Sequence, residues 1–326
     1  MSRRARLAFG LLALLVGTAL FADLLANELP LAVRTGGVTY VLPALTKPLA
    51  LADTTQLGLA SAAEWIVHTP VPFGPNQTFA TAVTRAEAAP WAPDAEHLLG
   101  TDELGRDVLA RLIHGARVSL LIGFGAVLIA LLVGLFLGVV AGYYGGFIDA
   151  AISRLTEVTF TFPSFFFFIA LAGMLRFTSV VPLVIVMGLT RWTDIARLVR
   201  AETLKLKELD FVLAVRVLGA SDARILARHI VPNALPPVLV AATFGVASAI
   251  LLESALAFLG IGVPPPTASW GELLIQAHRY LVHPGAWWLA VFPGLAVAGT
   301  VLTMNLVGEA LQDLQSATSN ATHQTR

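Results

Sequence analysis

Residues 118–141 contain no charged side chain, and most of them are apolar. A helix needs about 20 such residues to cross the hydrocarbon core of a bilayer, so this run is long enough to span a membrane. Five further hydrophobic runs are candidates for the same role: residues 7–22, 159–175, 180–192, 235–259 and 287–307. We therefore predict an all-α polytopic membrane protein with about six transmembrane helices.

The composition agrees with this class of protein. Charged residues make up 13% of the chain, about half of their usual share of roughly 25% in globular proteins. The formal net charge is zero, which gives no indication of nucleic-acid binding. Cysteine is absent, so disulfides, thiolate catalysis and cysteine metal sites are excluded. His278 and His283 have no carboxylate array near them in the sequence, and we expect no metal site.

The distribution of basic residues predicts how the chain is oriented. Arginines precede the first hydrophobic run, and residues 191–229 hold a second cluster of arginines and lysines. Because basic loops stay in the cytoplasm, both termini and this loop are expected on the cytoplasmic side of the membrane. A cleaved secretory signal is the alternative for the first run, although residues 20–22 make a mediocre cleavage site. The orientation is the same in either case.

The chain divides accordingly into four parts. Residues 1–26 hold the cytoplasmic N-terminus and the first transmembrane helix, and residues 27–116 form an external segment. The transmembrane core follows at residues 117–314 and contains the cytoplasmic loop 191–233. Residues 315–326 are expected to be a cytoplasmic tail.

Three glycines recur at every fourth position of the second hydrophobic run: Gly134, Gly138 and Gly142. This spacing places them on one helix face. Small residues allow two membrane helices to approach closely, and we expect these glycines to pack against a neighbouring helix. The alternative is that glycine is simply frequent in membrane helices.

A short apolar knob, residues 211–218, lies between charged flanks in the stretch 205–233 of the basic loop. The knob is too short to cross a bilayer, and an apolar patch is not normally left exposed to water. It is therefore predicted to dock into a partner protein as a helix in a groove. A loop lying on lipid headgroups is the alternative.

The knob is predicted to be a helix that ends in a bend. Phe211, Val215 and Leu218 would stack on one face of this helix. Gly219 follows at the position where helices commonly end in the left-handed conformation.

A second helix is predicted to follow the bend. Ser221 is placed to cap it, and Asp222 lies in its first turn, at the positive end of the helix dipole. This helix is expected to stop before Pro232, because proline disrupts the interior of a helix.

With these residues, the loop resembles the cytoplasmic "EAA" loop of ABC-importer permeases. Ala214, Gly219 and Pro232 match that pattern, and the distance from the glycine to the proline is the usual one. Leu213 replaces the first Glu of the motif and Val215 its second Ala, so the resemblance implies docking without a Glu-mediated contact. The residues implied in coupling to an ATPase are Phe211, Val212, Leu213, Ala214, Val215, Arg216, Leu218, Gly219, Ala220, Ser221, Asp222 and Pro232.

A second set of motifs carries an independent resemblance. Residues 97–120, 141–146, 258–262 and 265–271 are similar to signatures of dipeptide, oligopeptide and nickel permeases of the second, or "C", subunit type. The external segment is longer than usual and is similar to the subgroup associated with oligopeptides and the peptide-nucleotide antibiotic microcin C. Contact with a substrate-binding protein and a surface elaboration without a role are both open for it.

The resemblance implies a type I ABC-importer permease fold and a set of partners. This chain and a homologous second permease subunit would form a heterodimeric pore, two separate subunits would bind ATP and Mg, and an external solute-binding protein would deliver substrate. Peptides or peptide-like compounds are implied as substrates, with nickel or another small solute as the alternative. The chain has no G-x-x-x-x-G-K-[ST] P-loop, so we expect a non-catalytic subunit without a cofactor of its own.

Two other function classes are less well supported by the sequence. A secondary active transporter would need no ATPase, but it should show an inverted repeat and broken helices around midplane charges. No repeat between the two halves is evident. An intramembrane enzyme would need H-E-x-x-H or paired midplane carboxylates, and the sequence has neither.

A few ionisable residues remain candidates for function. Glu253 lies late in the fifth hydrophobic run and would either line the transport pathway or pair structurally with a neighbouring helix. Asp102, Arg106 and Asp107 would form either a charged external platform or a solvated loop with capping roles.

Overall fold

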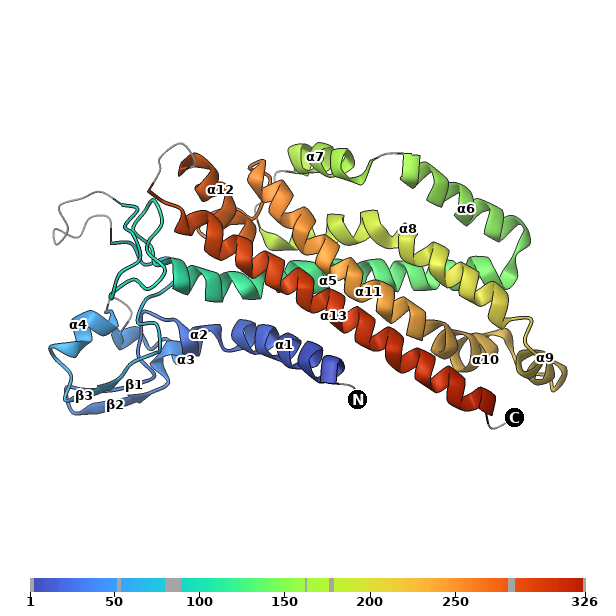
Figure 1. Cartoon of the computed structure of the whole chain (residues 1–326), viewed down its shortest axis with the longest axis horizontal. Helices are drawn as coiled ribbons and strands as arrows, with labels where there is room; N and C mark the ends of the chain where they lie inside the picture. The colour runs from blue at the N-terminus through green and yellow to red at the C-terminus, as the bar shows by residue number, and fades with distance from the viewer. Residues whose placement is uncertain are drawn as a thin grey trace. The chain divides into compact units, whose positions relative to one another are not determined.

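The computed structural model describes residues 3–51, 54–79, 89–161, 163–175, 179–280 and 285–324. The chain divides into two compact units. The first unit comprises Met1–Leu12, Ile122–Leu252 and Val301–Arg326, and the second comprises Ala13–Leu121 and Glu253–Thr300. Four helices contribute to both units: α1 (Arg3–Leu20), α5 (Val108–Tyr144), α11 (Val231–Phe258) and α13 (Trp288–Gln324) (Figure 1).

Among the described residues, three helical stretches are long and apolar enough to cross a membrane: Val108–Tyr144, Asp222–Phe258 and Trp288–Ser316. The first contains the second predicted span, and the other two match the fifth and sixth predicted spans to within one residue. The pair α6 (Gly146–Thr161) and α7 (Ser164–Leu175) would supply a fourth if counted as one bent span. The predicted first and fourth spans coincide with α1 and with α8 (Val180–Leu206), which do not reach this threshold. A mostly helical membrane protein is confirmed, and the count of six remains a prediction.

The third predicted span, residues 159–175, is interrupted in the structure. Helix α6 already begins at Gly146, and its axis and that of α7 differ by 84°. The break falls next to Pro163, whose ring and missing N–H end a regular helix. Gly145 and Gly146 have φ of 67° and 55°, so they reverse the chain between α5 and α6.

The helix after the knob does not stop before Pro232, contrary to the prediction. Helix α10 (Asp222–Ile225) continues through a π-helical turn, Leu226–Ile230, into α11. In this wider turn the backbone N–H of Val231 donates to the Leu226 carbonyl. Pro232 is the second residue of α11, and as a proline it has no N–H that would need an acceptor.

A three-stranded antiparallel sheet departs from the predicted all-α class. Strand β1 (Ala32–Thr35) lies between β2 (Val38–Val41) and β3 (Trp65–Val67). Gly36 and Gly37, both with positive φ, form the two-residue hairpin turn between β1 and β2. The sheet belongs to the second unit, together with the short elements α2 (Ala22–Leu25), α3 (Pro43–Thr46), η1 (Leu49–Leu51) and α4 (Gln56–Ala60).

A small apolar core supports the sheet. Leu29, Val33, Leu51 and Leu59 are buried together beneath the strands. One helix of the second unit, α12 (Trp270–Tyr280), also lies outside the predicted spans.

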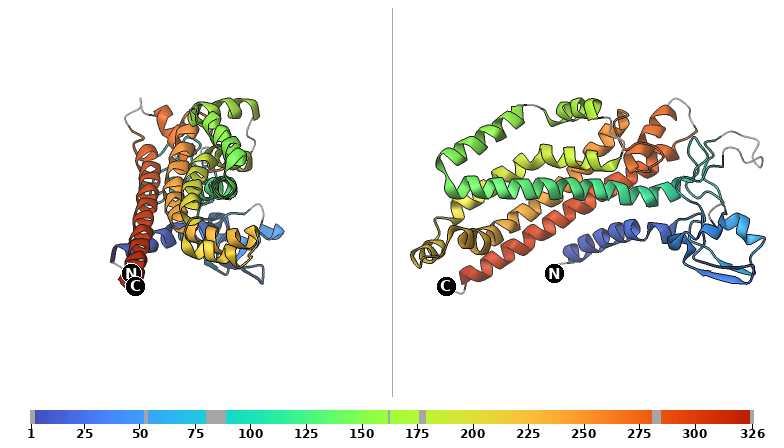
Figure 2. Two further views of the ribbon diagram at one scale, coloured as in Figure 1. Left: turned by 90° about the vertical axis from the view of Figure 1, so that its right-hand side faces the viewer. Right: turned by 180° about the vertical axis from the view of Figure 1, so that it is seen from behind.

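The first unit holds the other helices. Helix α8 runs along α5 on one side and along α6 on the other (Figure 2). At the end of α8 the chain enters α9 (Asp210–Val217), which precedes α10. The first unit therefore contains the whole of the predicted docking loop.

Candidate functional site

The predicted docking loop has a buried base. Val212, on helix α9, has no exposed surface, nor do Ile225 and Ile230. These three side chains form one apolar cluster with Tyr143, near the end of α5. Burial of such side chains stabilises a fold by about 1.5–3 kcal/mol each. The cluster therefore fixes the loop to the transmembrane helix that precedes it.

Polar contacts fix the same base. The Tyr143 hydroxyl donates a hydrogen bond of 2.6 Å to Oδ1 of Asp222, and the Arg216 guanidinium carbon lies 5.4 Å from the centre of the Tyr143 ring. Lys207 Nζ donates to the carbonyl of Gly142 at 2.8 Å. No role was predicted for Tyr143, although a tyrosine close behind the apolar run 118–141 is a signal for such an anchor.

The apolar tip of the loop is exposed. The side chains of Val217 and Leu218 are 87% and 85% exposed, and those of Phe211 and Leu213 are each 42% exposed. The predicted stack of Phe211, Val215 and Leu218 stays a prediction. The buried face of α9 carries Val212 with the partly buried Val215.

The predicted bend at Gly219 is confirmed in its conformation. Gly219 has a φ of +82°. Its N–H donates to the Arg216 carbonyl at 3.0 Å, and the N–H of Ala220 donates to the Val215 carbonyl at 3.3 Å. These two bonds form a Schellman motif, which ends a helix through a left-handed residue. The bend thereby sets the direction in which the exposed tip points.

The remaining residues of the predicted docking loop differ in their contacts and exposure. Ser221 is the N-cap residue of α10, but its side chain makes no capping hydrogen bond. Asp222 and Ile225 instead hold the start of α10 to Tyr143. Ala214 and Pro232 are exposed. Within the predicted set, Val212 is the one residue that is fully buried.

The three glycines of α5 lie against α8. A Cβ on Gly134 would come within 2.6 Å of the Trp192 carbonyl oxygen, and one on Gly138 within 2.6 Å of the Ala196 carbonyl oxygen. A Cβ on Gly142 would lie 2.7 Å from Cβ of Thr203. The backbones therefore approach more closely than any larger residue permits, as expected for small residues at four-residue spacing.

Replacing Gly138 with leucine is expected to separate α5 from α8. The new side chain would meet a backbone carbonyl, which cannot move aside, so we expect a loss of about 1–3 kcal/mol or more in folding free energy. Thermal unfolding of the purified protein in detergent measures this loss. Gly10→Leu is the matched control, because outside its own stretch of helix no atom of a described residue lies within 4 Å of a Cβ at Gly10. Equal stability of the two variants would contradict the packing.

Glu253, in the second unit, is fully buried near the end of α11. Its Oε1 accepts a hydrogen bond of 2.8 Å from the Ser269 hydroxyl, whose oxygen accepts at 3.1 Å from the N–H of Glu272. Its Oε2 has no partner among the described residues. This geometry favours structural pairing between α11 and the start of α12 over a role in lining a pathway.

The residues considered as an external platform are buried instead. Asp102 has no exposed surface and pairs through Oδ2 with Nε of Arg106 at 2.7 Å. The same Oδ2 lies 3.4 Å from Nε of Arg111, whose Nη2 contacts Oε2 of Glu272 at 2.5 Å. Neither a charged surface nor a solvated loop describes this group, because the opposite charges neutralise each other inside the second unit.

Asp107 belongs to the same buried region and begins helix α5. Its Oδ1 accepts from the N–H of Ala110 at 2.7 Å, which is an N-cap hydrogen bond, and its Oδ2 lies 2.9 Å from Nδ1 of His97. The capping role is thus confirmed for Asp107. Among the described residues, no group of three or more His, Cys, Asp or Glu side chains is arranged to hold a metal ion.

The amino-acid sequence is similar to those of known membrane transport proteins. Residues 134–318 match the family model described as "Binding-protein-dependent transport system inner membrane component". The chain is similar to the "Dipeptide transport system permease protein DppC" of Alkalihalophilus pseudofirmus, with 40% identity over 68% of this chain and 72% of that protein. It is also similar to the "Di/tripeptide transport system permease protein DppC" of Pseudomonas aeruginosa, with 38% identity over 77% of this chain and 80% of that protein.

Proposed function

The chain belongs to the inner membrane components of binding-protein-dependent transport systems, and from this membership we propose that it is a permease subunit of an ATP-driven peptide importer. The observation that carries the proposal is the exposed apolar tip at Val217 and Leu218 on a buried base. A tip of this form fits a groove on a separate ATPase subunit.

The anchoring of the loop supports a lever mechanism. Apolar packing and the hydrogen bond from Tyr143 to Asp222 join the tip to the end of α5. A displacement of the tip would therefore be passed to a transmembrane helix as a rigid-body motion. ATP-driven closure of the ATPase subunits would rock the spans from an inward-open to an outward-open state, and hydrolysis would reset them.

The remaining partners and the orientation follow from the same proposal. A homologous second permease subunit would complete the pore as a heterodimer, two ATPase subunits would bind ATP and Mg, and an external solute-binding protein would deliver the substrate. The positive-inside rule supports cytoplasmic termini and a cytoplasmic loop 191–233. Residues 27–116 would then lie outside, between the first and the second of about six spans.

Peptides are the substrates that we propose. The relatives at 40% and 38% identity carry names that refer to dipeptides and to di- or tripeptides. Nickel or another small solute is the alternative, and direct uptake measurements with a peptide panel and with nickel would separate them.

Purification together with the partner subunits tests the proposal. We expect a stable complex with ATPase subunits, in which ATP hydrolysis requires this chain and rises when the loaded solute-binding protein is added. Ion-coupled uptake catalysed by the purified chain alone would contradict the importer and favour a secondary transporter.

Truncating the tip tests the docking surface itself. Leu218→Ala removes most of an apolar side chain whose burial in a groove would contribute about 1.5–3 kcal/mol. Affinity for the ATPase subunits is therefore expected to fall by about tenfold to a hundredfold, measurable by titration of the purified subunits. Leu49→Ala is the matched control, because Leu49 is 92% exposed on the second unit. A loss of the same size in both variants would argue against docking at the tip.

A further inference from the structure

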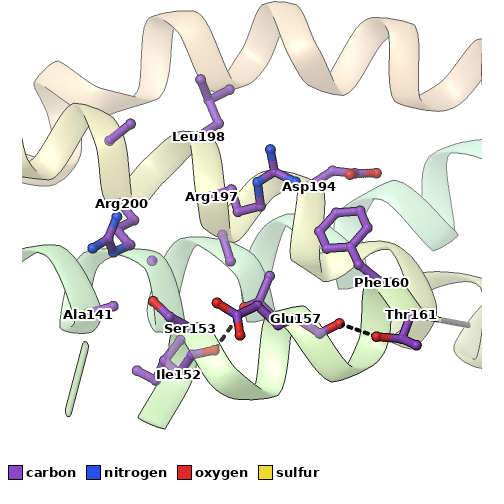
Figure 3. A pocket seen from close by; sticks show the side chains of 14 residues that line it. Ala141, Ile152, Ser153, Glu157, Phe160, Thr161, Asp194, Arg197, Leu198 and Arg200 are labelled. Atoms are coloured by element: carbon purple, nitrogen blue, oxygen red, sulfur yellow. Dashed lines mark hydrogen bonds between the residues drawn. The ribbon is translucent and has the colours of Figure 1, made fainter. Parts of the chain in front are cut away.

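Helices α6 and α8 line a half-open cavity of about 910 Å³ in the first unit, to which α5 contributes Gly138 and Ala141. Figure 3 shows Asp194, Arg197 and Arg200 on α8, with Glu157 and Phe160 on α6. Sites for small molecules measure about 300–1,000 Å³, so the cavity is large enough for a short peptide.

Two of the four charged residues that line the cavity, Arg200 and Glu157, are already paired. Arg200 donates two hydrogen bonds to the carboxylate of Asp149, at 2.5 and 2.6 Å. Glu157 pairs with Arg154 at 2.6 Å. These four residues form local ion pairs and do not need a ligand to balance their charges.

Asp194 and Arg197 differ from the paired residues. Among the described residues, neither has an ion-pair partner, and both side chains are exposed to the cavity. They lie three positions apart on one face of α8, close enough to pair with each other. The Arg197 guanidinium carbon instead lies 4.9 Å from the centre of the Phe160 ring. One cation and one anion are thus left open beside an aromatic ring.

Asp194 and Arg197 follow directly on the fourth predicted span, residues 180–192, in the basic loop 191–233. A ligand that brings one negative and one positive group into the cavity would pair with both of them. A ligand-binding role was not predicted for these two residues, because in the sequence they belong to the start of the basic loop.

We propose that this cavity is a transit site for the two charged termini of a short zwitterionic peptide. Arg197 receives the terminal carboxylate, which a guanidinium can bind through two parallel hydrogen bonds. Asp194 receives the terminal ammonium group, and Phe160 contacts the chain between the termini. The inference rests on the proposed function, because it requires that peptides enter the permease.

Binding to the assembled complex tests the site without the solute-binding protein. The complex of this chain with its permease and ATPase partners is dialysed to equilibrium against three radiolabelled probes: trialanine, N-acetyl-trialanine and trialanine amide. The first has both charged termini, and each of the others lacks one. Trialanine is expected to bind, and each block is expected to weaken binding about tenfold, because a hydrogen bond to a charged group is lost.

The variants then assign each terminus to a residue. In Arg197→Gln, trialanine and its amide are expected to bind equally, while the acetyl block still weakens binding. In Asp194→Asn, the acetyl block is expected to have no effect, while the amide block keeps its effect. Arg34→Gln is the control, since Arg34 lies on the sheet of the second unit, and all three wild-type affinities should persist in it.

The outcomes separate this inference from the proposed function. No binding of trialanine, or a loss in each variant that is equal for all three probes, would overturn the transit site. In that case, peptide uptake driven by ATP would still support the proposed importer. Failure of the chain to assemble with ATPase subunits would instead overturn the proposed function.

Discussion

Gly219→Val is expected to abolish uptake while leaving membrane insertion intact. Gly219 has a φ of +82°, a conformation in which a β-branched residue is a genuine outlier. Apart from its two chain neighbours, no atom of a described residue lies within 4 Å of a Cβ at this position, so the strain comes from the backbone alone. Valine would break the Schellman bonds made by Gly219 and Ala220 and turn the exposed tip away from its partner. Transport by cells or proteoliposomes, with the protein level in the membrane, measures both effects.

Gly219→Asn is the matched variant. Asparagine adopts the left-handed conformation more readily than other residues with a side chain, and the open space at Gly219 accommodates it. We expect Gly219→Asn to retain much of the uptake. Normal transport by Gly219→Val would show that the bend does not position the tip.

Arg111→Met is expected to cause the largest loss of stability in the second unit. Arg111 has no exposed surface and contacts the carboxylates of both Asp102 and Glu272. Removing one partner from a buried ion pair leaves an uncompensated charge, which costs about 3–5 kcal/mol. Thermal or chemical unfolding of the purified protein in detergent should show this loss.

An exposed ion pair of the same chemistry provides the control. Arg154 contacts Glu157 at 2.6 Å, but the two side chains are 82% and 61% exposed. Surface pairs contribute about 0–1 kcal/mol, so Arg154→Met should change stability little. A similar loss in both variants would contradict the importance of the buried network.

Local signals in the sequence predicted the parts of the fold that depend on neighbouring residues. The bend at Gly219 follows from a glycine directly after an apolar helical run, and the close helix contact follows from the four-residue spacing of glycines such as Gly138. Backbone conformation and helix periodicity decide both features, and neither needs information about distant parts of the chain.

Features that depend on distant residues were not predicted. Arg111 and Glu272 are 161 positions apart, so their ion pair has no local signal. The sheet is built from strands of three or four residues, too short for a reliable alternating pattern. The helix continues past Pro232 only because a π-helical turn precedes it, and proline alone predicted a stop.

Cysteine cross-linking tests the central claim, that the tip of the loop docks onto an ATPase subunit. The chain has no cysteine of its own, so Val217→Cys introduces a unique thiol at a side chain that is 87% exposed. With a reagent that carries a maleimide and a photoreactive group, Val217→Cys in the assembled complex is predicted to cross-link to an ATPase subunit. Leu49→Cys, equally accessible on the second unit, is predicted not to do so. Cross-linking to the ATPase from Leu49→Cys and not from Val217→Cys would contradict the account.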